Sequence, residues 1–203
     1  MKTISILIPC YNEQESLPAL YKRLKTLTES IKNYKFEILF VNDGSRDNTL
    51  KIIKELRQQD DSINYVDLSR NFGKEIAMIA GIDHINSDAM IVMDADLQDP
   101  PELIKEMLYW WEQGYKDVCA KRKSRAGETW FKKWSSHTYY KVLQKVTSIP
   151  VQPDVGDFRL LDRQCIDALK QMRESQRYTK GLFSWIGFDK KEILFDRDAR
   201  VAG

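Results

Sequence analysis

The sequence has few cysteines and histidines and no long apolar run. Its 203 residues include three cysteines, Cys10, Cys119 and Cys165, without Cys-x-x-Cys spacing, and two histidines that share no metal-ligand spacing with them. This pattern indicates neither a disulfide framework nor a zinc site, and it is typical of a reducing compartment. No stretch approaches the roughly 20 apolar residues that span a bilayer, and the first residues do not resemble a signal peptide. We therefore expect the chain as given to be soluble.

Two common nucleotide-binding motifs are also missing. The sequence has no Gly-x-Gly-x-x-Gly and no Gly-Lys-Ser/Thr, which disfavours a dinucleotide-binding Rossmann site and a P-loop. Lys and Arg number 32 against 30 Asp and Glu, and this near-balance gives no reason to expect a nucleic-acid partner. The basic residues are nevertheless concentrated, because residues 121–145 hold eight Lys or Arg and only one acid, Glu128.

What is present is a regular alternation of two hydrophobic patterns. Short apolar runs bounded by turn formers predict strands, and apolar residues at helical spacing predict helices. The predicted strands cover 4–9, 36–45, 63–69 and 89–93, and the predicted helices cover 16–31, 47–59, 75–85 and 101–114. Strands that alternate with helices of this length predict an α/β fold with a doubly wound, mostly parallel central sheet flanked by helices.

Carboxylates gather where the last of these strands ends. Residues 89–102 read AMIVMDADLQDPPE, so Asp94 and Asp96 follow the apolar run directly. Ligands of such sheets bind outside the carboxyl ends of the strands. In an extended chain the two side chains point the same way, and a divalent cation would relieve their repulsion. The alternative is an acidic turn that only caps the helix beginning near Pro101.

Five motifs carry a resemblance to a known family. They are IPCYNE, VNDGSRDNT, LSRNFGKEIAMIAG, MDADLQDPPE and GDFRLLDR. In this order and spacing they resemble the family 2 inverting glycosyltransferases that transfer a sugar to a polyprenyl phosphate, a group that includes dolichol-phosphate mannose synthase and the bactoprenol glucosyltransferases. The resemblance covers essentially the whole chain. It implies one GT-A catalytic domain over 1–203, with a nucleotide-sugar-binding half at 1–120 and an acceptor-side half at 121–203.

The resemblance also implies a set of donor-site residues. The residues expected to bind the nucleotide sugar are Pro9, Tyr11, Glu13, Asp43, Lys74, Asp94 and Ala95. Lys74 is the weakest of these, since a role at the start of a helix accounts for it equally well. The expected cofactor is Mg²⁺ or Mn²⁺, bridging the donor diphosphate and held by Asp94, Asp96 and Gln98.

For the acceptor side the resemblance implies catalytic and phosphate-binding residues. Asp157 and Asp96 are the expected catalytic residues. A phosphate monoester is mostly dianionic at pH 7, so we expect Asp157 to orient the acceptor or the sugar at least as much as to accept a proton. The cations expected to meet the acceptor phosphate are Arg122, Arg125, Arg159 and Arg200.

Residues 128–146 interleave aromatic residues with lysines. This composition is typical of an amphipathic helix at a membrane interface, and equally of a surface helix whose aromatics pack on the sheet. In the related enzymes membrane-embedded helices follow the catalytic domain. We therefore expect a membrane segment to be missing after residue 203, and the native protein to lie on the cytoplasmic face of the membrane.

The function favoured by the sequence is transfer of a hexose, with glucose preferred, from a UDP-sugar to a polyprenyl phosphate such as undecaprenyl phosphate. Three alternatives stay open: a GDP-mannose-dependent mannosyltransferase, a soluble family 2 enzyme acting on a polysaccharide, and a non-catalytic nucleotide-binding scaffold. The expected partners are the donor, the polyprenyl phosphate and the membrane surface, and the sequence leaves a homo-oligomer open.

Overall fold

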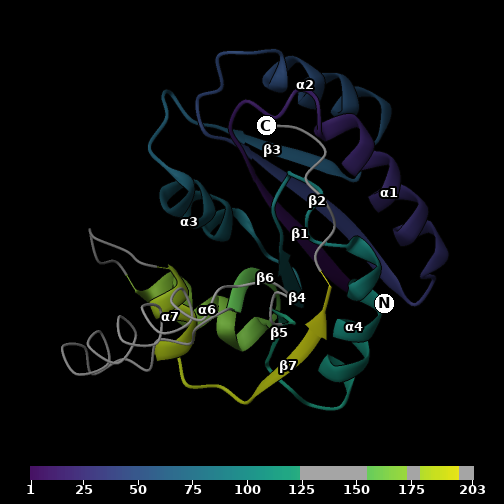
Figure 1. Cartoon of the computed structure of the whole chain (residues 1–203), viewed down its shortest axis with the longest axis vertical. Coiled ribbons are helices and arrows are strands. Elements are labelled where there is room, and N and C mark those ends of the chain that lie inside the picture. The colour runs from purple at the N-terminus through teal and green to yellow at the C-terminus, as the bar shows by residue number, and fades with distance from the viewer. Residues whose placement is uncertain (124–154, 173–178, 197–203) are drawn as a thin grey trace, which may run out of the picture.

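The computed structural model describes residues 1–123, 155–172 and 179–196. Within them seven strands form one sheet in the order β3-β2-β1-β4-β6-β5-β7 (Figure 1). The strands are β1 (Lys2–Cys10), β2 (Tyr34–Asn42), β3 (Ile63–Asp67), β4 (Ala89–Val92), β5 (Asp117–Arg122), β6 (Val155–Asp162) and β7 (Lys190–Phe195). The α/β class and the central sheet predicted from the sequence are confirmed.

The sheet is mostly parallel, with one exception. β1 pairs in parallel with β2 and β4, β2 with β3, and β5 with β7. β6 lies between β4 and β5 and runs antiparallel to both. The amino end of β6 therefore lies beside the carboxyl end of β4, which brings the residues at the start of β6 to the edge where ligands are expected.

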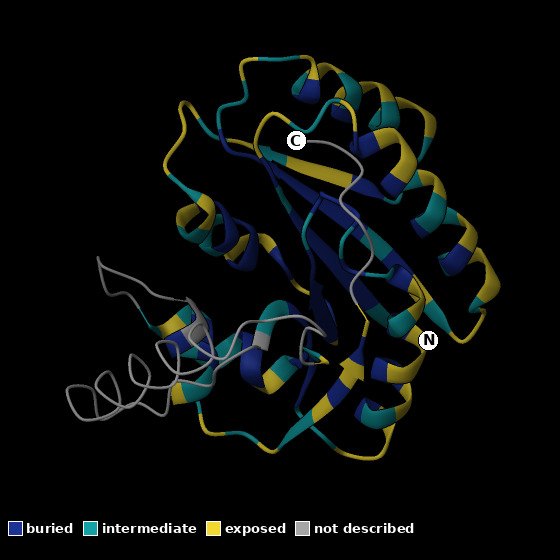
Figure 2. Cartoon of the chain, in the orientation of Figure 1, coloured by how far each residue is buried: buried dark blue, intermediate teal, exposed yellow. Residues whose placement is uncertain are grey.

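Helices cover both faces of this sheet (Figure 1). They are α1 (Leu17–Ser30), α2 (Thr49–Gln59), α3 (Lys74–His84), the short 3₁₀ helix η1 (Pro101–Leu103), α4 (Ile104–Glu112), α6 (Arg163–Gln171) and α7 (Thr179–Trp185). Apolar side chains of α1, α2 and α4 pack on one face, and those of α3, α6 and α7 pack on the other. The central strands are buried between these layers, while the edge strand β3 is exposed (Figure 2).

Gly81 leaves no room for a side chain where helix α3 packs against the sheet. A Cβ atom added at Gly81 would be 2.2 Å from Cδ1 of Leu7 in β1 and 3.0 Å from Cγ2 of Val41 in β2. A larger side chain at Gly81 would force either the side chains of Leu7 and Val41 or the helix itself to move. Because Lys74 is the first residue of α3, the packing of this helix against the sheet also fixes the position of the Lys74 backbone.

The predicted helices and strands of residues 1–114 are all found, with boundaries shifted by a few residues. The sequence did not predict β5, β6 or β7, whose runs are short and mixed with charged residues. One local expectation is wrong. β4 ends at Val92, Asp94 lies just beyond it, Asp96 lies in a turn and Leu97 has a left-handed backbone with a φ of 62°, so Asp94 and Asp96 are not in an extended strand. The predicted amphipathic helix at 128–146 lies outside the described residues.

Candidate active site

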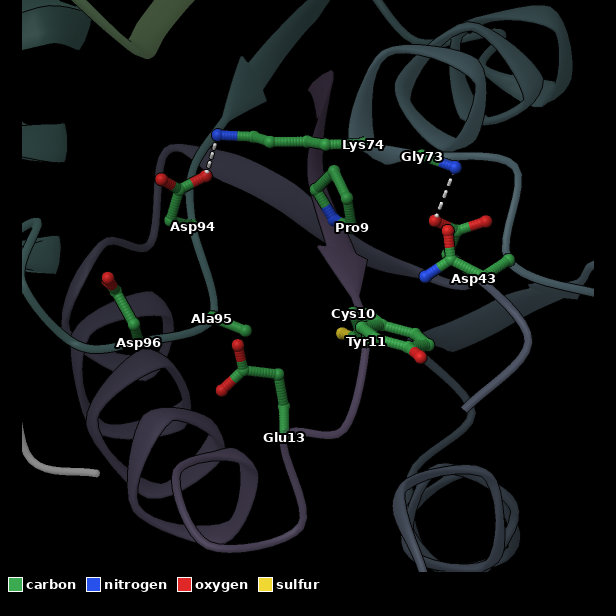
Figure 3. Close-up of a pocket in the computed structure, with 11 residues that line it drawn as sticks. Pro9, Cys10, Tyr11, Glu13, Asp43, Gly73, Lys74, Asp94, Ala95 and Asp96 are labelled. Atoms are coloured by element: carbon green, nitrogen blue, oxygen red, sulfur yellow. Dashed lines mark hydrogen bonds and ion pairs between the residues drawn. The ribbon is translucent and has the colours of Figure 1, made fainter. Parts of the chain in front are cut away.

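A cavity of about 280 Å³ opens at the carboxyl ends of β1, β2 and β4 (Figure 3). The residues that line it are Pro9, Cys10, Tyr11, Glu13, Asp43, Asn71, Gly73, Lys74, Asp94, Ala95 and Asp96. Every residue predicted to bind the nucleotide sugar is in this set. Parallel strands explain this arrangement, since their carboxyl ends all meet at the same edge of the sheet.

Asp43 fixes the wall of the cavity nearest α3. Its side chain is buried, and its two carboxylate oxygens accept hydrogen bonds from the backbone N–H groups of Phe72 (2.8 Å) and Gly73 (2.9 Å). The neighbouring Gly44 has a φ of 63°, and a Cβ there would lie 2.3 Å from the backbone carbon of Arg70. The two loops are therefore in backbone contact. Asp43 holds the loop before α3, and its contact with a nucleotide base stays a prediction.

The cavity is strongly acidic. Among the described residues, Glu13, Asp43, Asp94 and Asp96 contribute carboxylates to its lining, and Lys74 contributes the ammonium group. A nucleoside diphosphate is itself an anion, so these carboxylates would repel it unless a cation came with it.

The pKa of Asp99 reflects the same excess of negative charge. Burial, together with the charges of Asp94 and Asp96, raises the pKa of Asp99 to about 6, and the charge of Arg122 works in the opposite direction. Asp96 is buried, and its Oδ1 accepts a hydrogen bond from the backbone N–H of Gln98 at 3.1 Å. The turn after β4 therefore concentrates carboxylates in a region with little access to water.

These residues fit a divalent cation such as Mg²⁺ or Mn²⁺. Carboxylate oxygens are the donors that both ions prefer, and a cation would balance the charge that perturbs Asp99. In the described part of the chain no three His, Cys, Asp or Glu side chains converge on one point. The protein would thus supply only part of the coordination shell, which suits an ion that takes its other ligands from a diphosphate and water. Gln98 does not line the cavity, so its predicted role as a ligand gains no support from its position.

A substitution of Asp99 tests this electrostatic description. The pKa of Asp99 rises from 3.8 in the unfolded chain to about 6 in the folded one, so the folded state holds the proton more tightly. Wild-type stability should therefore fall as the pH rises from 4 to 6, and Asp99→Asn should escape this loss. Above pH 6 we expect the variant to gain free energy of unfolding relative to wild type, by at most about 3 kcal/mol.

The measurement is urea unfolding at several pH values between 4 and 8, in buffer with a chelator. Asp61→Asn is the matched control, because Asp61 is an acid fully exposed to solvent. A stability difference for Asp99→Asn that stayed constant across this range would contradict the shifted pKa.

Asp157 lies at the start of β6, beside the cavity. Its Oδ2 accepts a hydrogen bond from the ammonium group of Lys74 at 2.6 Å, and the same ammonium lies 2.5 Å from Oδ1 of Asp94. The side chain of Asp157 is only 9% exposed. Tertiary structure therefore brings the predicted catalytic residue next to the predicted metal ligand, although 63 positions separate them in the sequence.

The predicted phosphate-binding arginines have different positions. Arg122 ends β5, is half-buried and lies near enough to Asp99 to lower its pKa, which places it next to the acidic turn. Arg125 and Arg200 lie outside the described residues. Arg159 lies in the core, where its guanidinium pairs with Asp117 at 3.2 Å.

The surroundings of Arg159 speak against a contact with phosphate. The side chain is 3% exposed, it stacks on the ring of Phe183 at 4.2 Å, and it donates a hydrogen bond to the carbonyl of Gly156 at 3.2 Å. Lys190 also lies 3.5 Å from Asp117. Arg159 is thus part of a buried ion cluster that holds β6 in place beside Asp157. The proposed acceptor site therefore does not include Arg159.

Cys10 and Trp111 are both buried in the core. Burial raises the pKa of the Cys10 thiol well above its usual value, and the charges of Glu13 and Asp94 add to the effect, which disfavours the thiolate that a nucleophile requires. Trp111 is buried and donates a hydrogen bond to Asp162 at 2.8 Å.

Comparison with known proteins identifies the family of this chain. A family model described as Glycosyl transferase family 2 matches residues 5–169, which is most of the chain. The chain belongs to glycosyltransferase family 2. Its membership confirms the resemblance that the five motifs carry.

Family 2 relatives match nearly the whole chain. An uncharacterized glycosyltransferase from Synechocystis is 48% identical over 200 residues, which cover 98% of this chain and 63% of the relative. A bactoprenol glucosyl transferase from Shigella phage SfX is 38% identical over 200 residues, which cover 98% of this chain and 65% of the relative. The chain thus spans somewhat less than two thirds of the length of these relatives.

Solved structures of glycosyltransferases share the fold. A mannosyltransferase from Pyrobaculum calidifontis, in complex with GDP-Man and Mn²⁺, has a TM-score of 0.63 at 14% identity, over 98% of this chain and 57% of that one. Glucosyl-3-phosphoglycerate synthase from Mycobacterium tuberculosis, in complex with Mn²⁺, UDP and phosphoglyceric acid, has a TM-score of 0.65 at 16% identity, over 100% of this chain and 72% of that one. The fold is therefore GT-A.

Proposed function

We propose that this chain transfers a hexose, with glucose favoured, from a UDP-sugar to a polyprenyl phosphate with inversion at the anomeric carbon. The observation that carries the proposal is the convergence of the motif residues on one cavity, with Asp157 joined to it through Lys74. The relative named bactoprenol glucosyl transferase supports both the lipid acceptor and the glucosyl group.

On the donor side, the strand ends provide the nucleotide site. Pro9, Tyr11 and Glu13 follow β1 and would contact base and ribose, and Asp43 would face the base. Asp94 and Asp96 would hold Mg²⁺ or Mn²⁺. When bound, such an ion acts as a Lewis acid that stabilises the negative charge developing on the leaving diphosphate.

On the acceptor side, the chain must bind an anion that attacks from the opposite face of the sugar. Arg122, with Arg125 and Arg200, would hold the acceptor phosphate through charge-assisted hydrogen bonds. Asp157 would orient the sugar or, through Lys74, the acceptor for in-line attack, because a dianionic phosphate needs little help to lose a proton. Residues 1–120 would then form the donor half and residues 121–203 the acceptor half of one catalytic domain.

We also propose that the whole protein works at the cytoplasmic face of the membrane, where its lipid acceptor is available. Residues 128–146 have the composition of a membrane-facing helix. In the part of the chain that the structure describes, no helix combines the length and apolar character needed to cross a bilayer.

Calorimetric titration with UDP and with GDP, each in Mn²⁺ and in chelator, tests the donor assignment. We expect UDP to bind about tenfold or more tightly with Mn²⁺ than without it, because the ion relieves the repulsion between the diphosphate and the acidic lining. We expect GDP to bind more weakly than UDP.

The other outcomes have distinct meanings. Preference for GDP would move the assignment to a GDP-sugar enzyme, such as the mannosyltransferase alternative. Absence of binding by either nucleotide, in a chain that is folded by circular dichroism, would contradict the proposed transfer reaction for this chain.

A further inference from the structure

The ammonium group of Lys74 bridges two carboxylates with different expected roles. Its Nζ lies 2.5 Å from Asp94, a predicted metal ligand, and 2.6 Å from Asp157, the predicted catalytic residue (Figure 3 shows the contact with Asp94). The bridge therefore connects the donor side of the cavity to the acceptor side.

The pairing of β4 with β6 explains why a cation is needed at this point. The last pair of their antiparallel register is Val92 with Arg159. Asp94 follows Val92 by two residues and Asp157 precedes Arg159 by two, so both carboxylates lie at the same end of the sheet. Carboxylates this close repel each other, and the ammonium group of Lys74 contacts both.

Lys74 is held in place by its own helix. Asp43 fixes Gly73 directly before it, and the close approach of Gly81 to β1 fixes the helix behind it. At its other end, the ammonium group is held by the carboxylates of Asp94 and Asp157. The lysine is thus a fixed positive charge in the site.

A bound divalent cation would need the same carboxylate. With Lys74 at 2.5 Å from Asp94, two cations would compete for one group unless the ammonium moved. A donor diphosphate offers Lys74 a new anionic partner, and the side chain is 40% exposed and borders the cavity. The hydrogen bond to Asp157 does not require Asp94 and can persist.

We propose that Lys74 is a positioning residue that serves as an exchangeable counter-ion. In the donor-free chain it neutralises Asp94 and Asp157 together. When the metal ion and the nucleoside diphosphate enter, it releases Asp94 to the metal, turns to the diphosphate and continues to hold Asp157. This inference rests on the proposed function, because it requires a metal-bound diphosphate in the cavity.

If Lys74 exchanges Asp94 for the diphosphate, removal of its charge should strengthen the binding of Mn²⁺ and weaken the binding of UDP. Lys74→Met removes the competitor at Asp94, so Mn²⁺ alone should bind about threefold to tenfold more tightly, as measured by electron paramagnetic resonance without nucleotide. The same variant also removes a positive charge from the diphosphate. UDP at saturating Mn²⁺ should therefore bind about tenfold more weakly by calorimetry.

Three further variants make the experiment specific. Lys35→Met is the matched control, because it removes a lysine that pairs with Glu37 at 2.8 Å at the opposite end of the sheet, and neither affinity should change. Lys74→Arg keeps the charge, so both affinities should stay near wild type. Lys74→Gln repeats the charge removal with a polar side chain, in case Lys74→Met does not fold.

Two results would overturn the inference. Equal or weaker Mn²⁺ binding by the uncharged variants would show that Lys74 does not compete with the metal. Unchanged UDP affinity in these variants would show that Lys74 does not turn to the diphosphate. Failure of the proposed function looks different, since in that case wild type itself would not bind UDP with Mn²⁺.

Discussion

Replacement of Asp157 by asparagine is expected to lower kcat for sugar transfer to a polyprenyl phosphate by about a hundredfold or more. Asparagine has nearly the same size, so the buried position at the start of β6 should tolerate it. It has no charge, so it loses the ion pair with Lys74 and can no longer orient the acceptor through a carboxylate. Since Asp157 does not line the donor cavity, the KM for the UDP-sugar should change much less than kcat.

A matched variant separates this effect from general loss of an ion pair. Glu37→Gln removes a carboxylate that pairs with Lys35 near the amino end of β2, and we expect its kcat to equal that of wild type. A kcat for Asp157→Asn within threefold of wild type would mean that Asp157 is not a catalytic residue.

The pH dependence of kcat, measured for wild type and for Asp157→Asn, distinguishes an orienting role of Asp157 from proton transfer. If Asp157 accepted a proton in the rate-limiting step, kcat of wild type would fall at low pH and this limb would be absent in Asp157→Asn. If it orients the acceptor or the sugar, the fall of kcat at low pH should come from protonation of the acceptor phosphate, whose second pKa is about 6, and should persist in Asp157→Asn at a lower kcat. We expect the second result, because the acceptor phosphate is already largely dianionic.

The second large effect is expected for Asp96→Asn, in the binding of UDP. Loss of this carboxylate should weaken Mn²⁺-dependent UDP affinity by at least about tenfold to a hundredfold, because the cation loses an anionic ligand. The fold should survive, since the amide oxygen of asparagine can still accept the hydrogen bond from Gln98 that Asp96 accepts at 3.1 Å. Calorimetry with UDP, in Mn²⁺ and in chelator, measures the change.

In chelator the two enzymes should differ little, or the variant should bind UDP more tightly. Removal of one carboxylate reduces the repulsion felt by the diphosphate when no cation is present. Asp61→Asn, which removes an exposed acid next to Arg57, should bind UDP as wild type does. The assigned metal role of Asp96 would be wrong if Asp96→Asn kept the full dependence of UDP affinity on Mn²⁺.

Much of the donor site was predictable because its residues lie at or just after the carboxyl ends of predicted strands. The apolar runs of β1, β2 and β4 are short and bounded by turn formers, so their ends could be located to within a few residues. Parallel strands bring these ends to one edge of the sheet, and for this reason the residues after each strand share a cavity.

Arg159 shows where prediction from sequence stops. It follows Asp157 by two positions in a motif rich in polar residues, and nothing local distinguishes an arginine that faces a ligand from one that enters the core. Its role depends on Asp117 and Phe183, which come from other elements and surround the guanidinium. An arginine can be buried only where such partners neutralise and cover it, and those partners are brought together by the fold.

The sequence by itself determined the α/β class, the alternation of its first strands and helices, and the motif residues that line the cavity. The class and the alternation follow from hydrophobic periodicity, and the motif residues follow from the resemblance to family 2. Only the tertiary structure decided that β6 runs antiparallel beside β4, that Asp94 and Asp157 therefore come close together, and that Lys74 bridges them. The physical reason is that these contacts join residues distant in the chain, and their distances depend on how strands pair and on how closely α3 packs against the sheet.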